Sequence, residues 1–515
     1  MDSVPDEECG PTTSFSTASW SAPSWATFSP SAKLPELPVT KWITPRRYST
    51  LEKTPTEILV QVLSMMPWRD VLRARQTCKR VADVTTARSI WLHHYRLLCD
   101  SFTVLPALGK PIELCTSHDI ETITLSWIKS RRNWCSQEGV PRVVELKIPY
   151  PGCQAALVPG SRWLLVYSLE GALEGSVFAY DLHAPMPQEP HRVIIPQDNI
   201  ANQHFTSMMI DVDHDQPQLT FTVCLRQSTP GQDASLATIV FYRVTQVGHG
   251  PDAKLESTRI NSLQLPETDY LYSKILRGRY YARLHERKSE GNLAERIEIY
   301  DWMASSSSEY TLAFVNIEAG QQHYRFDILS GEKLFIFWYD SFEVFHFSTM
   351  HKMKVGTNNN LNDQLSLKPY WVQDVPSLPL DGPVISAARF HSRSASTRLT
   401  YASKDGLYAI TIPAGPQKPQ HFRLWDIHVD FNYLTWLGMN SWYYISWEKE
   451  LICRSSFLWP TDPIYDPDDE PVCGPGNMIE LKSPCVLGPR ISLDESTYMA
   501  AVVGTMNGNY TFLFF

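Results

Sequence analysis

The feature that most constrains the fold of this chain is a rhythm of short β-favouring runs that begins after Pro141 and continues to Phe515. The runs hold five to eight residues, are bounded by Gly, Pro, Asn and Asp, and come in triplets such as QAALVPG, RWLLVYS and SVFAYDL. Apolar runs between turn residues are typical of antiparallel strands. Seven triplets follow one another, and their third runs end near residues 182, 244, 302, 347, 412, 456 and 515.

A repeat of about 55 residues is close to the longer blade repeats, so we predict a seven-bladed β-propeller over residues 141–515. Five units carry a fourth, outer run: HRVIIP, NSLQLP, TLAFVNI, HFRLWDI and MIELKS. The seventh unit has none, and the run at residues 142–149 is expected to supply it and to close the ring. The repeats share Tyr-Asp endings at residues 180–181 and 300–301 but no strict motif, so a large sandwich or paired barrels stay open as alternatives.

Three segments precede this all-β domain. Residues 1–48 are rich in Ser, Thr and Pro and have no hydrophobic period, so we expect a disordered tail. Residues 49–99 change to a helical period and are expected to form a small all-α module. A further helix is expected over residues 118–134, inside a helical linker at residues 100–140. The predicted protein is therefore multidomain.

Charge and composition argue against several classes of function. The chain has 46 Lys and Arg against 55 Asp and Glu, a formal charge of -9, which disfavours nucleic acid as a partner. The ten cysteines include no Cys-x-x-Cys pair, so neither a zinc knuckle nor a redox motif is expected. The sequence has no apolar run of about 18 residues and no secretory signal, so we expect no membrane span and a cytoplasmic or nuclear location.

The motifs that resemble catalytic or metal sites are incomplete. HERKS at residues 285–289 begins like a zinc-protease helix, but a serine replaces the second histidine and the surroundings favour a strand. DVDHD at residues 211–215 resembles a calcium loop without its turn glycine. The histidines at residues 93–94 point about 100° apart on a helix, and the acidic stretch at residues 462–470 is expected to be a solvated loop. We therefore predict no catalytic residue, no metal site and no cofactor.

The most informative segment begins at Thr54. Thr54, Pro55 and Glu57 have the pattern of a capping box with proline at the first helical position. The helix that follows carries an apolar stripe wide enough for one contact inside the module and one outside it: Ile58, Leu59, Val62, Leu63 and Met66. A module of about 45 residues is too small to bury all of this surface alone. By periodicity alone, the stripe fits equally well a helical cap packed on the β domain.

In an ungapped register, the same segment resembles the F-box, a motif of cullin-RING ubiquitin ligases. The matching positions are TPTEIL at 54–59, VLS at 62–64, MP at 66–67, DVLR at 70–73, TCKRV at 77–81 and IW at 90–91. The chain departs from the family pattern at Thr54 for Leu, Thr77 for Val and Val81 for Trp. The whole chain is thus similar to fungal-type F-box proteins with an N-terminal F-box and a C-terminal β-propeller-like domain.

The resemblance implies a three-helix module that docks on a Skp-type adaptor, and through it on a cullin, while the β domain captures an unknown protein substrate. The implied adaptor-binding residues are Pro55, Glu57, Ile58, Leu59, Val62, Leu63, Pro67, Val71, Leu72, Val81 and Trp91. Residues 41–100 carry eleven Lys or Arg and five acidic residues, a charge that favours an acidic partner. Two alternatives stay open: a propeller hydrolase, which would place carboxylates or histidines at the ring axis, and a non-degradative scaffold.

Overall fold

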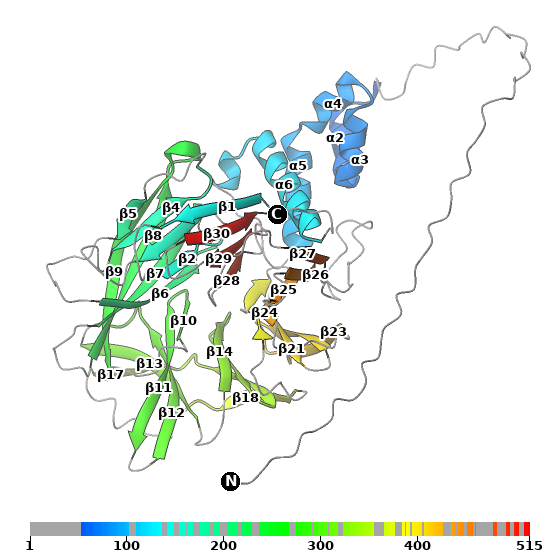
Figure 1. Cartoon of the computed structure of the whole chain (residues 1–515). Helices are drawn as coiled ribbons and strands as arrows, with labels where there is room; N and C mark the ends of the chain where they lie inside the picture. The colour runs from blue at the N-terminus through cyan, green and yellow to red at the C-terminus, as the bar shows by residue number, and fades with distance from the viewer. Residues whose placement is uncertain are drawn as a thin grey trace, which may run out of the picture. The chain divides into compact units, whose positions relative to one another are not determined.

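The computed structural model describes residues 53–101 and 110–135 and, between residues 142 and 514, the strands with some of their connections (Figure 1). The predicted tail at residues 1–48 and the acidic stretch at residues 462–470 lie outside the described residues. The helical elements are α2 (Thr56–Met65), α3 (Trp68–Arg75), α4 (Lys79–Thr85), α5 (Arg88–Ser101), η1 (Ile112–Leu114), α6 (Ser117–Cys135) and η2 (Gly250–Asp252). Helix α6 confirms the helix predicted over residues 118–134. None of the described helices is long and apolar enough to cross a membrane.

In the described part of the chain the strands form seven antiparallel sheets, numbered here in chain order. The first contains β2 (Gln154–Leu157), β3 (Trp163–Tyr167), β4 (Val177–Asp181) and β5 (His191–Ile194). The second contains β6 (His204–Val212), β7 (Thr220–Ser228), β8 (Leu236–Val247) and β9 (Lys254–Pro266). The third contains β10 (Lys274–Arg277), β11 (Tyr280–Ser289), β12 (Asn292–Asp301), β13 (Glu309–Ile317) and β17 (His351–Lys354).

The remaining four sheets follow the same order. The fourth contains β14 (His323–Leu329), β15 (Lys333–Trp338), β16 (Ser341–His346) and β18 (Pro369–Asp374). The fifth contains β19 (Val384–Ile385), β20 (Arg389–His391), β21 (Ser396–Ser403), β22 (Gly406–Pro413) and β23 (Gln420–Trp425). The sixth contains β24 (Leu434–Leu437), β25 (Ser441–Ser446), β26 (Leu451–Ser456) and β27 (Asn477–Glu480), and the seventh contains β28 (Ile491–Asp494), β29 (Met499–Val503), β30 (Asn509–Phe514) and β1 (Arg142–Lys147).

The run at residues 142–149 closes the seventh sheet as predicted. Strand β1 pairs antiparallel with β30, from Arg142 opposite Phe514 to Lys147 opposite Asn509. The sheet order is β1, β30, β29 and β28, so the N-terminal strand of the β domain takes the fourth, outer position. The side chains of Leu146 and Ile148 are buried with residues of the first sheet.

The sheets follow one another in a closed series. The first strands are neighbours in the pairs β6 and β10, β10 and β14, β19 and β24, β24 and β28, and β28 and β2. Arg325 of β14 donates to the carbonyl of Ile385 in β19 (2.7 Å), which links the fourth sheet to the fifth. One hydrophobic core is shared by the first and second sheets. Four-stranded sheets in this cyclic order define the β-propeller fold.

The five predicted fourth runs form the fourth strands of their sheets, β5, β9, β13, β23 and β27, and this part of the prediction is confirmed. The sequence did not predict β18 or β17, the strands on the outer edges of the fourth and third sheets. In the fifth sheet, two short strands, β19 and β20, both pair with β21. Both missed strands lie at sheet edges, where side chains are partly exposed and the hydrophobic pattern is weak.

The shared Tyr-Asp endings have a structural explanation. Asp181 at the end of β4 forms an ion pair with Arg162, directly before β3 (2.7 Å). Asp301 at the end of β12 forms the equivalent pair with Arg279, directly before β11. In both sheets the carboxylate therefore ties the end of the third strand to the start of the second.

Candidate adaptor-binding surface

Helix α2 begins one residue later than the capping box predicts. Pro55 occupies the N-cap with an extended backbone (φ -52°, ψ 144°), and no side-chain hydrogen bond caps the helix there. The Pro55 carbonyl instead accepts from the Leu59 N–H (3.1 Å). The helix ends at Met65, because Met66 is extended and Pro67 caps the next helix. The predicted cap by Thr54 is therefore wrong by one position.

The helical module contains four helices, α2 to α5, in place of the three that the resemblance implied. Helix α4 ends at Thr85, and α5 begins at Arg88. The helices enclose one core, which contains Leu59, Leu63, Val71, Val84, Ile90, Trp91, Tyr95, Cys115 and Ile120. Cys115 and Ile120 belong to the segment predicted as the linker, so that segment completes the core of the module.

Polar contacts fix the last helices of the module in place. Arg75 donates to Glu121 of α6 (2.6 Å) and to the hydroxyl of Thr85 (2.9 Å). The Trp91 indole donates to the Thr85 carbonyl (2.8 Å), and the Arg75 guanidinium lies 5.6 Å from the centre of the Trp91 ring. Arg88 donates to the carbonyl of Ile112 (2.7 Å). These contacts link α3, α4, α5 and α6 to one another.

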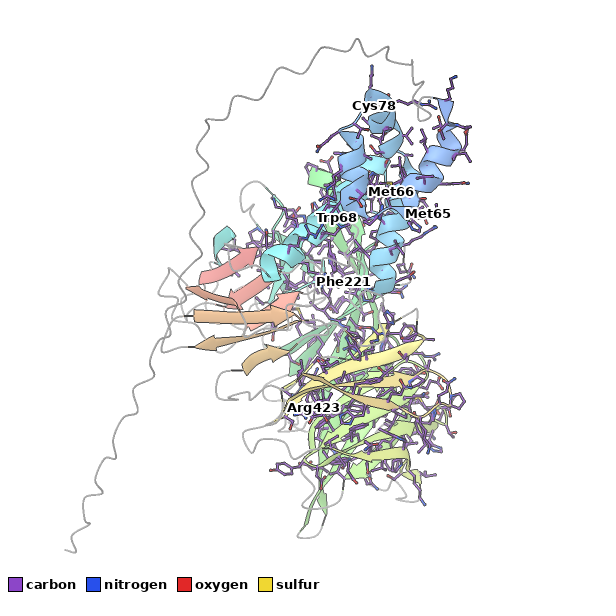
Figure 2. All side chains as sticks on the ribbon, turned by 90° about the vertical axis from the view of Figure 1, so that its right-hand side faces the viewer. Met65, Met66, Trp68, Cys78, Phe221 and Arg423 are labelled. Atoms are coloured by element: carbon purple, nitrogen blue, oxygen red, sulfur yellow. The ribbon has the colours of Figure 1, made fainter. Side chains whose placement is uncertain are left out.

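The opposite face of α2 carries an apolar surface that stays exposed. Ile58, Val62 and Met65 are 46%, 45% and 76% exposed. Because they are spaced by four and three residues, they lie on one side of the helix. Figure 2 labels Met65, Met66, Trp68 and Cys78 on the same module. We call Ile58, Val62 and Met65 the α2 stripe.

Burial divides the eleven predicted adaptor-binding residues into two groups. Five are buried inside the module: Leu59, Leu63, Val71, Val81 and Trp91. Leu72 is half-buried, and five are exposed: Pro55, Glu57, Ile58, Val62 and Pro67. Only the exposed residues and Leu72 are available for direct contact with a partner. Met65, the most exposed of the stripe, was not predicted, although its spacing of seven residues from Ile58 was a usable signal.

His94 of α5 is a buried titratable group within this module. Its side chain is 1% exposed, and burial, aided by the nearby His93, lowers its pKa to about 4. Among the described residues its Nε2 atom has no hydrogen-bond partner. The folded module therefore holds His94 in the neutral form at physiological pH.

Acid is therefore expected to destabilise the module. The pKa of His94 is about 4 in the folded chain and about 6.5 in the unfolded chain, so the unfolded state binds a proton more readily. The free energy of unfolding is therefore highest above pH 6.5 and decreases as the pH falls toward 4. The loss at pH 4 is on the order of 3 kcal/mol. Thermal unfolding followed by tryptophan fluorescence at pH 7 and pH 4.5 measures it. His94→Gln should reduce this pH dependence, whereas His93→Gln should retain most of it. An equal pH dependence in His94→Gln and the parent chain would contradict the assignment.

The segments that resembled metal or catalytic motifs are structural parts of the β domain. HERKS lies in strand β11, as its surroundings predicted. Asp211 of the calcium-like segment accepts from the Gly278 N–H (2.6 Å) and pairs with Arg277 (3.3 Å). Arg277 also pairs with Asp327 of β14 (3.4 Å). Arg277 of β10 thus joins the carboxylate of Asp211 in β6 to the carboxylate of Asp327 in β14. The described residues contain no group of three side chains able to hold a metal ion.

Comparison with known proteins bears on the helical module. Residues 52–97 match the F-box-like family model. No curated protein matches the sequence significantly. The solved structure of the Dos1 propeller matches 73% of this chain and 95% of that chain, at 9% sequence identity and a TM-score of 0.26. The assignment of the propeller fold therefore rests on the strand pairing and cyclic order described above.

The chain carries an F-box-like domain followed by a β-propeller-like domain. An F-box domain indicates an adaptor role in a ubiquitin ligase of the Skp–cullin–F-box type.

Proposed function

We propose that this chain is the substrate-recognition subunit of a cullin-RING ubiquitin ligase. The helical module binds a Skp-type adaptor, and through it a cullin, while the propeller binds a protein target. The observation that carries this proposal is the α2 stripe, an exposed apolar surface on a module that matches the F-box-like model and already has a complete core of its own.

The contact surface consists of the exposed members of the predicted set together with Met65. Pro55 and Pro67 flank helix α2 at its two ends, and the stripe lies between them. The helices that follow α2 carry exposed Arg73, which pairs with Asp70 (2.9 Å), and exposed Lys79. A partner with an apolar groove and an acidic rim fits such a surface. The buried residues of the predicted set support the contact by holding α2 in place.

The propeller is assigned to target binding, and no reaction is assigned to it. The hydrolase alternative requires unpaired carboxylates or histidines at the ring axis. The carboxylates Asp211 and Asp327, on the first strands of two sheets, are both paired with Arg277. Such ion pairs stabilise the arrangement of neighbouring sheets and leave neither carboxylate as a free base. This geometry supports a binding domain over a hydrolase.

The separate roles of the helical module and the propeller are tested in cells, first with the ligase inhibited and then with it active. Ile58→Asp with Val62→Asp, in the full chain, should keep targets bound in a pull-down and abolish their ubiquitination. The fold of the variant is checked by its melting temperature. Targets that are still ubiquitinated by this variant would contradict the adaptor role. Targets that bind the intact chain and never change in level or ubiquitination would favour the non-degradative scaffold.

A further inference from the structure

Strand β9 is the outer edge of the second sheet and is unusually long, with 13 residues. It pairs with β8 along its whole length, and within the described part of the chain no strand pairs with its other edge. The register slips between Phe241 and Tyr242, so Ile260 has no partner on β8. This bulge lies in the middle of the edge, and Ile260 is 41% exposed there.

The backbone of β9 presents hydrogen-bonding groups along this outer edge. The Leu255 N–H donates to His191 Nε2 (3.4 Å) and therefore points away from β8. Because alternate residues of a strand direct their backbone groups to the same edge, the N–H and carbonyl groups of Ser257 and Arg259 point outward as well. Unpaired groups of this kind form a template for another strand.

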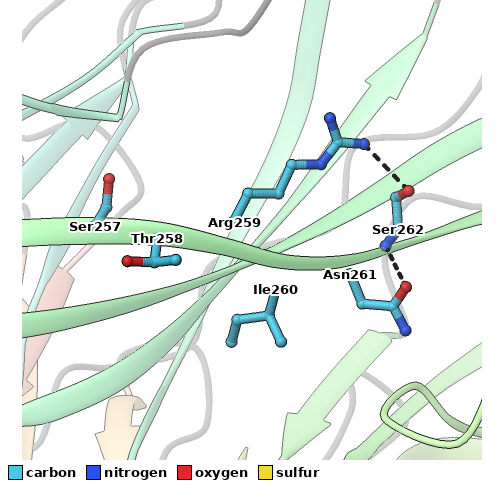
Figure 3. Close-up of a pocket in the computed structure, with 6 residues that line it drawn as sticks. All are labelled: Ser257, Thr258, Arg259, Ile260, Asn261 and Ser262. Atoms are coloured by element: carbon cyan, nitrogen blue, oxygen red, sulfur yellow. Dashed lines mark hydrogen bonds between the residues drawn. The ribbon is translucent and has the colours of Figure 1, made fainter.

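An open hollow of about 530 Å³ lies along this segment and is lined by the six residues Ser257–Ser262 (Figure 3). Arg259 is the charged residue of this lining and is exposed. Its guanidinium donates to Ser262 Oγ (3.1 Å), a contact that uses one of its five N–H donors. The hollow thus combines an exposed strand edge, an apolar side chain and the Arg259 guanidinium, which forms no ion pair with any described residue.

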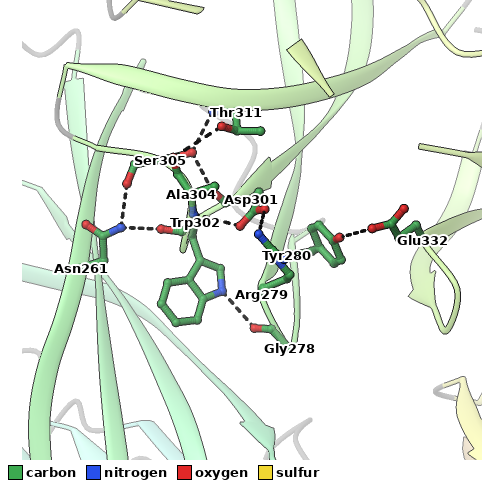
Figure 4. Close-up of polar contacts among 10 residues, drawn as sticks. All are labelled: Asn261, Gly278, Arg279, Tyr280, Asp301, Trp302, Ala304, Ser305, Thr311 and Glu332. Atoms are coloured by element: carbon green, nitrogen blue, oxygen red, sulfur yellow. Dashed lines mark hydrogen bonds and ion pairs between the residues drawn. The ribbon is translucent and has the colours of Figure 1, made fainter. Parts of the chain in front are cut away.

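Both ends of the segment are held by neighbouring sheets. Ser257 Oγ donates to the carbonyl of Val193 in β5 (2.6 Å). Asn261 Nδ2 donates to the carbonyls of Ser305 (2.9 Å) and Trp302 in the third sheet (Figure 4). The edge between these anchors is therefore preorganised, which reduces the entropy lost when a peptide binds.

The chain already contains one example of strand addition at the equivalent place. In the third sheet the outer strand β13 is joined by β17, a four-residue strand that arrives from the segment between β16 and β18. Lys354 lies opposite Glu309 and His351 opposite Leu312 in an antiparallel register. An outer strand of this propeller thus accepts a short extended segment as a fifth strand.

We propose that β9 binds an extended acidic peptide of the protein target, which adds as a fifth strand to the second sheet. The peptide backbone pairs with Ser257 and Arg259, and an acidic side chain of the peptide contacts the Arg259 guanidinium. The chain has a net charge of -9, so an acidic peptide needs a local cation to dock, and Arg259 supplies that cation on this edge. This inference rests on the proposed function, because it names the target class of the same propeller.

The probe is a phage-displayed library of random decapeptides selected on the immobilised full chain, with affinities measured by fluorescence anisotropy. The enriched peptides are expected to contain an acidic residue and to bind Arg259→Glu at least tenfold more weakly. Arg243→Glu is the matched control. Arg243 lies opposite Thr258, and its side chain therefore projects from the other face of the sheet. This control should change the affinity less than threefold. Equal melting temperatures establish that both variants fold.

A second readout tests the strand geometry. Two versions of an enriched peptide are compared, one N-methylated at its odd-numbered residues and one at its even-numbered residues. One version should lose binding and the other should keep it, because only one edge of the peptide faces β9. The inference is overturned if no peptide is enriched, if Arg259→Glu binds as tightly as the parent chain, or if N-methylation has no effect in either parity. The proposed function is judged separately. Ile58→Asp with Val62→Asp should leave peptide affinity unchanged while it abolishes ubiquitination of the target. Arg259→Glu should weaken peptide binding while it leaves adaptor binding unchanged.

Discussion

Replacing Ile58 and Val62 together with aspartate is expected to raise the dissociation constant for a Skp-type adaptor by about 100-fold or more. Both side chains are nearly half exposed on α2, so the change removes apolar contact area from the interface and leaves the core of the module intact. In the complex, two carboxylates would be desolvated against an apolar groove, which is costly. Isothermal titration calorimetry with purified adaptor measures the change.

Two controls separate the contact from the fold. Thr56→Asp adds a charge at an exposed position of α2 that lies about 160° around the helix from Ile58, and it should weaken binding far less. Leu59→Ala changes a residue that is 5% exposed in the core. It should cost about 2–5 kcal/mol of module stability, with little effect on the affinity of the folded fraction. Adaptor binding that survives in the Ile58 and Val62 variant would contradict the assignment of this surface.

Breaking the pairing between β1 and β30 is expected to have the largest effect on stability. Val144→Pro with Leu146→Pro removes backbone donors from the strand and the buried Leu146 side chain. A loss of about 5 kcal/mol lowers the melting temperature of a domain of about 375 residues by roughly 6 °C. The released edge of β30 should also promote aggregation on heating. Differential scanning calorimetry and light scattering follow the two effects.

Arg142→Pro provides the matched control for this variant. Arg142 is the first residue of β1, a position where proline is tolerated in a strand. Its melting temperature should stay close to that of the parent chain. A double-proline variant that melts like the control would show that β1 contributes little to closure.

The sequence predicts the β domain well because its strands are separated by strong turn signals. The triplets are buried between neighbouring sheets, so their apolar character is high and regular, as in KLFIFW of β15. Strand β18 escapes prediction because four of its six residues are exposed, and edge strands have a weak hydrophobic pattern. Closure by residues 142–149 followed from an incomplete seventh unit, a deduction that needs no local signal.

The candidate site was predicted less completely, for a geometrical reason. Ile58 and Leu59 are adjacent and equally apolar, yet a rotation of about 100° per residue places one on the surface and the other in the core. An ungapped family register identifies both positions without telling them apart. Which face is buried depends on α5 and on Ile120 of α6, residues that lie far along the sequence. The edge of β9 depends in the same way on a bulge that no sequence pattern marks.

The pairing of β1 with β30 also sets an order of events during synthesis. Paired residues lie between 362 and 372 positions apart, because Lys147 faces Asn509 and Arg142 faces Phe514. At about 5–20 residues per second, roughly 20–75 s separate the emergence of the two strands from the ribosome. Throughout that interval the first strand lacks its partner, while the helical module, whose core ends at Ile120, is already complete. The helical module can therefore fold before the propeller closes, and the unpaired strand edge stays open to non-native pairing during that time.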